Sequence, residues 1–281
     1  MKTNKYVFWG MTQSTLIHVF LMGVAFTCLF PIFWMVRCAF MTNETVFLDK
    51  AFIPHHLNLG NFAIAWTKGN FAVYFLNSVI YTVCVVTGIV LIASLAAFAF
   101  SRLKFPGKNI IFYMFMAAMM VPLPGSFVAL FVLMNKLHLV NTRFGYILCM
   151  INVGLSMSIL LLKTFFDKMP RDLEDAARID GCGKIGIWWH VALPLARPAI
   201  AVVVIFNSLN VWNEYILATL LLGDSQLMPL QRGLMVFQGA NSTDYPVLMA
   251  GLTMAAIPII LIYLAMQKHI VKGLFLGEAA G

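Results

Sequence analysis

The chain has 281 residues, of which 61% are apolar and only 11% charged, and it carries a net charge of +8. Soluble domains keep about a quarter of their residues charged, so this composition excludes a soluble globular protein. Several apolar runs reach the roughly 20 residues needed to cross a bilayer core. We therefore expect an all-α polytopic membrane protein. In such a protein, positive charge reflects the bias of Lys and Arg toward cytoplasmic loops rather than a nucleic-acid partner.

Six apolar segments are predicted to be transmembrane helices. The first follows Lys2 and Lys5 and is expected to stay uncleaved, because no small-residue cleavage site closes it. The polar stretches between the first and second spans and between the fifth and sixth are expected to be outer loops. We expect a single transmembrane domain over residues 1–281, with spans at about residues 16–36, 71–100, 110–134, 144–166, 198–222 and 246–266.

The distribution of positive charge predicts the orientation. The segments assigned to the inner side hold 13 of the 19 Lys and Arg residues, and the outer ones hold 6. Since cytoplasmic loops are enriched in Lys and Arg, both termini are expected to be cytoplasmic. Residues 167–197, between the fourth and fifth spans, are then cytoplasmic as well.

Residues 167–197 are the most charge-dense and glycine-punctuated stretch of the sequence. Asp172, Glu174 and Asp175 suit the first turn of a helix, where negative charge meets the positive end of the helix dipole. Gly181 is a typical helix terminator because it adopts positive φ without strain. The pattern predicts two short helices around a glycine hinge, whereas an ordinary solvated loop is the simpler alternative.

The spacing within this stretch resembles the "EAA" motif of permease subunits of type I ATP-binding-cassette importers. The motif stands here as Asp175-Ala176-Ala177, then Gly181, then Leu193-Pro194. Further segments resemble the carbohydrate-uptake branch of that family, which takes up maltose, glycerol phosphate and multiple sugars: Asn77-Ser78, residues 101–107, Val121-Pro122, residues 139–142 and residues 212–215. The resemblance implies the type I importer permease fold and covers nearly the whole chain.

By this resemblance, the stretch docks on a separate ATPase subunit and passes its motion to the transmembrane helices. Two departures from the family occur here: Asp175 replaces the usual glutamate, with Glu174 beside it, and Gly181-Cys182-Gly183 replaces Gly-Ala-Ser. The residues expected to couple to the ATPase are Glu174, Asp175, Ala176, Ala177, Asp180, Gly181, Leu193 and Pro194.

The resemblance also implies the partners and the compartment. The expected partners are two ATPase subunits, an extracytoplasmic solute-binding protein and a second permease subunit, which in the sugar branch is usually a different chain. No cofactor is expected in this chain, since ATP and Mg belong to the ATPase subunits. The expected location is the cytoplasmic (inner) membrane of a bacterium or archaeon.

Polar side chains inside an apolar helix mark the candidate solute path. Buried polar groups are unfavourable in lipid unless they meet a partner or water. They are therefore expected either to form hydrogen bonds between helices or to contact a sugar directly, and the sequence leaves both interpretations open. The residues concerned are Asn207, Asn210, Trp212, Asn213 and Glu214 in the fifth span and Asn77 in the second.

Two other function classes were weighed against the importer. An ion-coupled secondary transporter or channel also needs polar groups within the membrane, but only Glu214 is a candidate carboxylate. A membrane enzyme needs a catalytic or metal-binding constellation, and the sequence contains no such pattern. Gly181-Cys182-Gly183-Lys184 lacks the spacing of a phosphate-binding loop, so we expect no nucleotide site in this chain.

Overall fold

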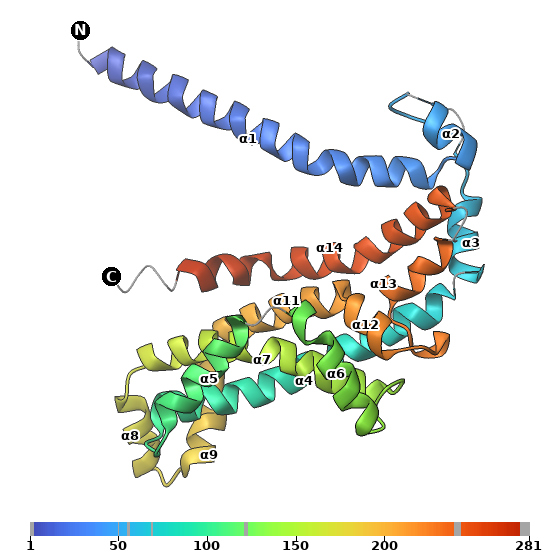
Figure 1. Cartoon of the computed structure of the whole chain (residues 1–281). Coiled ribbons are helices and arrows are strands. Elements are labelled where there is room, and N and C mark those ends of the chain that lie inside the picture. Colours follow the sequence, from blue (N-terminus) through green and yellow to red (C-terminus); the bar gives the residue numbers. More distant parts are fainter. Residues whose placement is uncertain are drawn as a thin grey trace. The chain divides into compact units, whose positions relative to one another are not determined.

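The computed structural model describes residues 3–49, 51–54, 57–68, 70–120, 123–238 and 243–275. The Val121-Pro122 pair therefore lies outside the described residues. Within them, the secondary structure is helical apart from an isolated bridge between Gln238 and Thr243 (Figure 1). The long helices are α1 (Thr3–Ala39), α4 (Phe71–Arg102), α5 (Lys108–Met120), α6 (Leu123–Lys136), α7 (Arg143–Lys168), α11 (Arg197–Asn213) and α14 (Tyr245–Phe275).

Shorter helices occupy the connections. Those that follow α1 and α11 are α2 (Asn43–Leu48), α3 (Gly60–Lys68), α12 (Ile216–Leu221), η2 (Ser225–Leu227), α13 (Leu230–Gly233) and η3 (Leu234–Phe237). Those of the charged stretch are α8 (Asp172–Ile179), α9 (Lys184–Ile187), the π-helical turn η1 (Trp188–Ala192) and α10 (Leu193–Leu195). The segments predicted as outer loops thus contain short helices.

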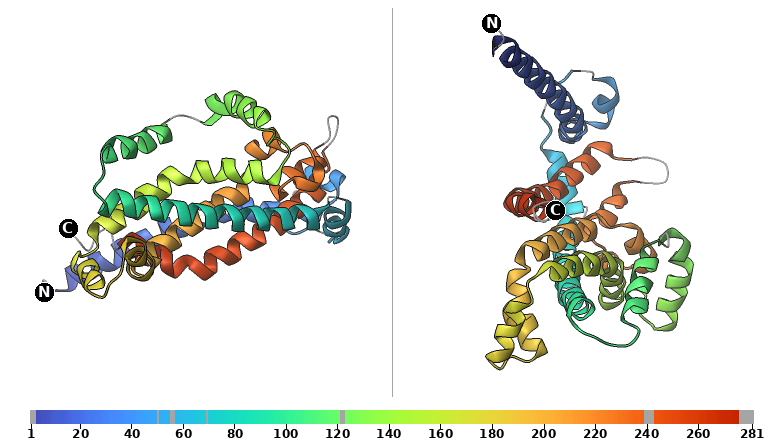
Figure 2. Two further views of the ribbon diagram at one scale, coloured as in Figure 1. Left: turned by 90° about the horizontal axis from the view of Figure 1, so that it is seen from below. Right: turned by 90° about the vertical axis from the view of Figure 1, so that its left-hand side faces the viewer.

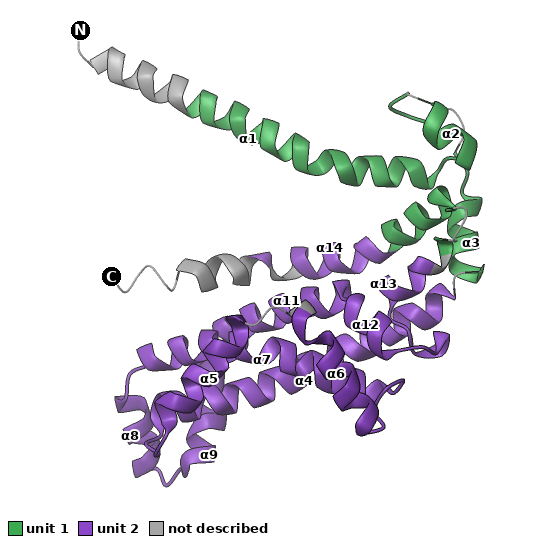
Figure 3. Cartoon of the chain, in the orientation of Figure 1, with its two compact units in different colours: residues 1–69, 236–254 green, residues 70–235, 255–281 purple. Residues whose placement is uncertain are grey.

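The chain divides into two compact units (Figure 3). Unit 1 comprises residues 1–69 and 236–254, and unit 2 comprises residues 70–235 and 255–281. Every residue predicted to couple to an ATPase or to line a solute path belongs to unit 2.

Unit 2 is built on α4 and α7, which pack along each other, with α11 alongside. Small residues permit the close approach: Ala93 and Ala97 on α4 are fully buried. A Cβ added to Gly154 on α7 would lie 2.4 Å from Ile89 Cδ1 and 2.3 Å from Asn207 Oδ1, so a larger residue there would displace these side chains. The α8–α9 segment lies at one end of the α4–α7 pair and α12 and α13 at the other (Figure 2).

Four helical stretches are long and apolar enough to cross a membrane: Ser14–Ala39, Phe71–Arg102, Arg143–Lys168 and Tyr245–Leu264. The number rises to six if α5 with α6, and the α9–α10 run with α11, each form one bent span. The range 198–222, predicted as one continuous span, is interrupted. Helix α11 ends at Asn213 and α12 begins at Ile216, because Glu214 adopts an extended conformation.

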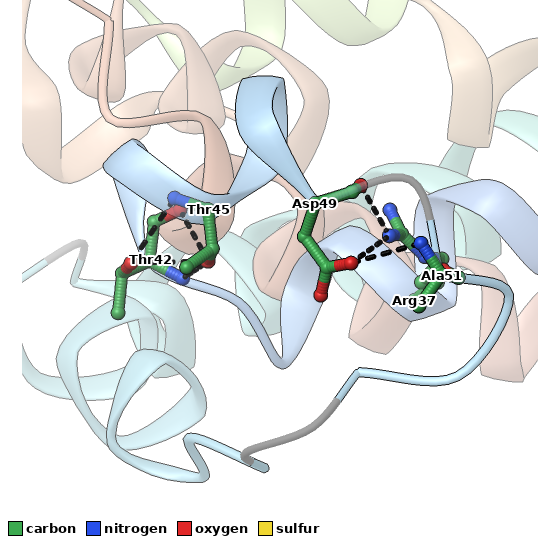
Figure 4. A network of polar contacts seen from close by, with 5 residues as sticks. All are labelled: Arg37, Thr42, Thr45, Asp49 and Ala51. Atoms are coloured by element: carbon green, nitrogen blue, oxygen red, sulfur yellow. Dashed lines mark hydrogen bonds and ion pairs between the residues drawn. The ribbon is translucent and has the colours of Figure 1, made fainter.

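In unit 1, Arg37 near the end of α1 forms hydrogen bonds with the segment that follows the helix (Figure 4). Its Nε donates to the Ala51 carbonyl at 2.8 Å, and its Nη2 donates to the Asp49 carbonyl at 2.7 Å. The guanidinium also lies 4.6 Å from the Trp34 ring centroid. These partners allow a cation to be buried at the end of an apolar helix.

The same segment begins α2 with a reciprocal cap. Thr42 Oγ1 accepts from the Thr45 amide at 3.3 Å, and Thr45 Oγ1 accepts from the Thr42 amide at 3.0 Å (Figure 4). This capping box pairs two backbone donors that a helix start otherwise leaves free. A stretch too weakly apolar to span a membrane therefore still contains a helix.

Candidate functional site

The charged stretch forms a helix that stops at Gly181. The Cys182 amide donates to the Ala177 carbonyl at 2.9 Å, and the Gly181 amide donates to the Arg178 carbonyl at 3.0 Å. With Gly181 at φ +84°, these two bonds form a Schellman motif. The chain then reverses into α9, so the predicted helix–glycine–helix arrangement is what the structure contains.

The inward face of α8 is joined to α4 by a buried ion pair. Arg102, the last residue of α4, places its Nε 2.6 Å from Glu174 Oε1, and both side chains are only 5% exposed. The same guanidinium donates through Nη2 to the Met169 carbonyl, which follows α7. Glu174 therefore lies inside the fold, and Arg102 connects α8 to the ends of α4 and α7.

The opposite face of α8 is open. Asp175, Ala176 and Asp180 are exposed. The Asp175 carboxylate accepts a hydrogen bond from Arg178 Nη1 at 2.7 Å, within the same helix. Ala177, by contrast, is buried beside Glu174. Of the two neighbouring carboxylates, only Asp175 is presented to the surface.

The second half of the stretch is held to the core by Trp188 and Ala192, which are buried. Between them the helix widens into a π-turn, in which the Leu193 amide donates to the Trp188 carbonyl. Pro194 has no amide to donate, and proline is a common cause of such irregularities. Leu193 is half-buried and Pro194 is exposed.

On α11, Asn207 is used for helix packing. Its Nδ2 donates to Ser158 Oγ on α7 at 3.0 Å and to the Val203 carbonyl at 2.8 Å, and the residue is 3% exposed. Trp212 is also buried, and its Nε1 donates to the Ala255 carbonyl at 3.2 Å. Both side chains therefore have partners inside unit 2.

Glu214 marks the break between α11 and α12. Its carboxylate accepts from the Leu217 amide at 2.6 Å, from the Ala218 amide at 3.1 Å and from the Tyr146 hydroxyl at 3.0 Å. A carboxylate in this position satisfies free amides at the start of a helix and meets the positive end of its dipole. The acidic side chain is therefore the cap of α12.

Asn210 and Asn213 lie with Glu214 along a pocket of about 330 Å³ beside α7 and α12. Both asparagines are exposed, and Asn213 Nδ2 donates to the Leu209 carbonyl of its own helix at 2.8 Å. The pocket combines carboxamides, a carboxylate and aromatic rings; its remaining lining residues are Phe127, Met150, Val153, Tyr215, Ile216 and Leu217. Such groups can hydrogen-bond and stack on sugar hydroxyls and rings.

Asn77 lies elsewhere, near the start of α4. Its Nδ2 donates to the carbonyls of Gln226 and Met228 at 2.8 and 3.0 Å, and its Oδ1 accepts from Arg143 Nη2 at 2.8 Å. Ser78 Oγ accepts from the Leu230 amide at 2.8 Å. These bonds fix the segment between η2 and α13 against α4, and Asn77 does not line the pocket.

Two residues that form these contacts were not predicted from the sequence. Arg102 was counted only as a positive charge of a basic loop, although its place at the end of an apolar run could have suggested a buried partner. Tyr146 gave no signal at all, because an aromatic residue in an apolar helix is ordinary. Among the described residues, no group of three or more His, Cys, Asp or Glu side chains could hold a metal ion.

Residues 88–275, which include the helix–glycine–helix segment and the pocket, match the family model described as the inner membrane component of binding-protein-dependent transport systems. The chain belongs to this family. It is accordingly a multi-pass component of the cytoplasmic membrane.

Individual relatives align over almost the whole permease. A probable ABC transporter permease, YurM of Bacillus subtilis, is 34% identical over 270 residues, covering 95% of this chain and 89% of the relative. The diacetylchitobiose uptake system permease NgcG of Streptomyces coelicolor is 32% identical, covering 90% and 84% respectively.

A solved structure shares the fold of this permease. A chain from the crystal structure of a bacterial ABC transporter involved in import of the acidic polysaccharide alginate has a TM-score of 0.77 and 25% identity. The match covers 96% of this permease and 99% of that chain. The fold is therefore that of an ABC-importer permease, as the sequence predicted.

Proposed function

We propose that this chain is the transmembrane subunit of an ATP-driven importer for a sugar or sugar derivative. Partner ATPases close on ATP, the α8–α9 segment moves with them, and the transmembrane helices alternate the access of the solute path. The importer comprises this permease, a second permease of a different sequence, two ATPase subunits and an extracytoplasmic solute-binding protein. ATP and Mg bind to the ATPase subunits.

The observation that carries the proposal is the two-sided construction of α8. Its inner face is locked to α4 through Arg102 and Glu174, whereas Asp175, Ala176 and Asp180 on the outer face lack a covering element within the described chain. Such a helix is rigidly linked to a membrane-spanning helix on one face and exposed on the other. It is therefore suited to transmit the movement of a partner that binds the exposed face. We assign the outer face to ATPase contact and the Arg102–Glu174 pair to transmission.

The proposed cargo follows from the relatives and from the pocket. Relatives include uptake permeases for diacetylchitobiose, arabinooligosaccharides and maltodextrin. The pocket beside Asn210, Asn213 and Glu214 offers amide and carboxylate groups together with the Tyr215 ring. These groups are the candidate sugar contacts, whereas Asn207, Trp212 and Asn77 support the helices around the path.

Reconstitution tests the proposal directly. The permease, its second permease, the ATPase and the binding protein are incorporated in liposomes, and uptake of a radiolabelled oligosaccharide is followed. Uptake should require ATP and the binding protein, and Asp175→Ala should reduce it several-fold. Uptake that persists without ATP, driven by an ion gradient instead, would establish the secondary-transporter alternative and refute the importer.

A further inference from the structure

A basic pocket lies at the end of α4, where the apolar run of this helix gives way to Arg102 and Lys104. It has a volume of about 310 Å³ and is bounded by the end of α4, the residues after it, α8 and the start of α9. Four cationic side chains line it together with the single carboxylate of Glu174. The cations are Arg102, Lys104, Arg178 and Lys184.

The positive charge of this pocket is only partly neutralised. Arg102 and Arg178 share the Glu174 carboxylate, at 2.6 and 3.7 Å, and Arg178 also pairs with Asp175. Within the described chain, Lys104 and Lys184 form no ion pair. Two ammonium groups from separate elements thus line one pocket without a counter-charge.

The remaining walls are apolar. Phe98, Leu103 and Ile187 line the pocket beside the cations. Phe98 lies one helical turn before the end of α4, which is long and apolar enough to cross a membrane, so we expect this wall close to the depth where acyl chains begin. A cationic pocket with an apolar wall at that depth suits a phosphate group that carries lipid chains.

We propose that this pocket binds the headgroup phosphate of an anionic phospholipid such as phosphatidylglycerol. Basic pockets beside transmembrane helices at the membrane surface bind lipid headgroups through the same chemistry. The bound phosphate would bridge Lys104 after α4 to Lys184 at the start of α9, and so hold the α8–α9 segment to the membrane surface. The residues of α8 assigned to ATPase contact, Asp175, Ala176 and Asp180, do not line this pocket.

The proposal is tested on the assembled transporter in detergent, by native mass spectrometry during titration with phosphatidylglycerol or with phosphatidylcholine of equal chain length. The parent should bind phosphatidylglycerol more tightly. Lys104→Gln with Lys184→Gln should weaken that binding on the order of tenfold, toward the phosphatidylcholine level. Both lysines are exposed, so the double variant should fold.

A matched control removes the same charge nearby. Lys168→Gln with Arg171→Gln alters two exposed cations outside the pocket and should leave phosphatidylglycerol affinity unchanged. Equal loss in both double variants, or no loss in the first, would overturn the proposal. Inorganic phosphate that binds the parent as tightly as the lipid would assign the pocket to free phosphate. Absence of lipid binding in the assembled transporter would also overturn the proposal.

Discussion

Glu174 and Asp175 are adjacent in the sequence, yet the fold gives them opposite environments. Glu174 is buried against Arg102, with a side chain 5% exposed, whereas the Asp175 side chain is 61% exposed. Helical geometry causes this separation, since successive residues are rotated by about 100°. One carboxylate therefore stabilises the permease, and the other is available to a partner.

This contrast predicts two separable phenotypes. Glu174→Gln leaves the Arg102 cation buried and uncompensated, which should destabilise the fold by about 3–5 kcal/mol. The matched variant Asp175→Asn removes only a surface pair with Arg178 and should change stability by less than about 1 kcal/mol. Thermal unfolding of the purified permease in detergent measures both.

Transport distinguishes the two variants further. Asp175→Asn should lower binding-protein-stimulated ATPase activity although the protein unfolds at the parental temperature. If Glu174→Gln were as stable as the parent, the structural role assigned to the Arg102–Glu174 pair would be wrong. Arg102→Met combined with Glu174→Leu should recover most of the lost stability, because no charge is then buried alone.

At the scale of the element, the glycine hinge between α8 and α9 offers a second test. Gly181 has φ +84°, whereas Gly183 has φ −73°, which any residue adopts. Gly181→Ala should cost about 1–2 kcal/mol locally, and Gly181→Pro also removes the amide that donates to Arg178. We expect Gly181→Pro to insert in the membrane but to uncouple ATP hydrolysis from uptake.

Gly183→Ala is the control for this hinge. No atom lies within 4 Å of the position that its Cβ would occupy, so uptake should stay at the parental level. Uptake and ATPase activity of the three variants are compared in liposomes at equal protein content. Parental coupling in Gly181→Pro would show that the hinge conformation is unimportant for transmission.

The break between α11 and α12 predicts a local change in dynamics. Glu214→Ala removes the acceptor for the Leu217 and Ala218 amides, which then lack a partner. Amide hydrogen exchange over residues 216–221 should accelerate at least several-fold relative to the parent. Asn213→Ala, which removes only a bond within α11, should leave that exchange unchanged; equal acceleration in both variants would contradict the capping role.

Helix types and approximate positions followed from the sequence, because long apolar runs and the turn at Gly181 depend on local chemistry. The break at Glu214 did not, since an isolated carboxylate in an apolar run looks the same whether it caps a helix or faces a cavity. The same carboxylate also accepts from the hydroxyl of Tyr146, 68 residues away in the sequence. The Arg102–Glu174 pair was equally hidden, because it joins two separate segments.

The polar residues of the fifth span show the same limit. In the continuous helix predicted over residues 198–222, offsets of three and four residues would bring Asn207, Asn210 and Glu214 to one face. In the fold, Asn207 bonds to Ser158 in the interior, whereas Asn210 and Glu214 line the pocket. Asn207 meets α7 beside Gly154, a contact between two separate helices that single-sequence patterns do not contain.

At the scale of unit 2, α4 runs from the segment between η2 and α13 to α8. It begins beside the segment that Asn77 and Ser78 hold in place and ends at Arg102, which holds α8 (Figure 1). Its 32 residues correspond to a length of about 48 Å. Under the proposed function, a displacement of α8 would be passed to this one helix, which contacts the segment between η2 and α13 near its other end.

This arrangement requires that the two ends of α4 face opposite sides of the membrane, with α8 and α9 in the cytoplasm. Ile185 in α9 and Ser225 in η2 are both exposed and suit introduced cysteines. In a variant with its five native cysteines replaced, Ile185→Cys should react with an impermeant maleimide only after the cells are opened. Ser225→Cys should react in intact spheroplasts; the reverse pattern would invert the orientation and remove α8 from the reach of a cytoplasmic ATPase.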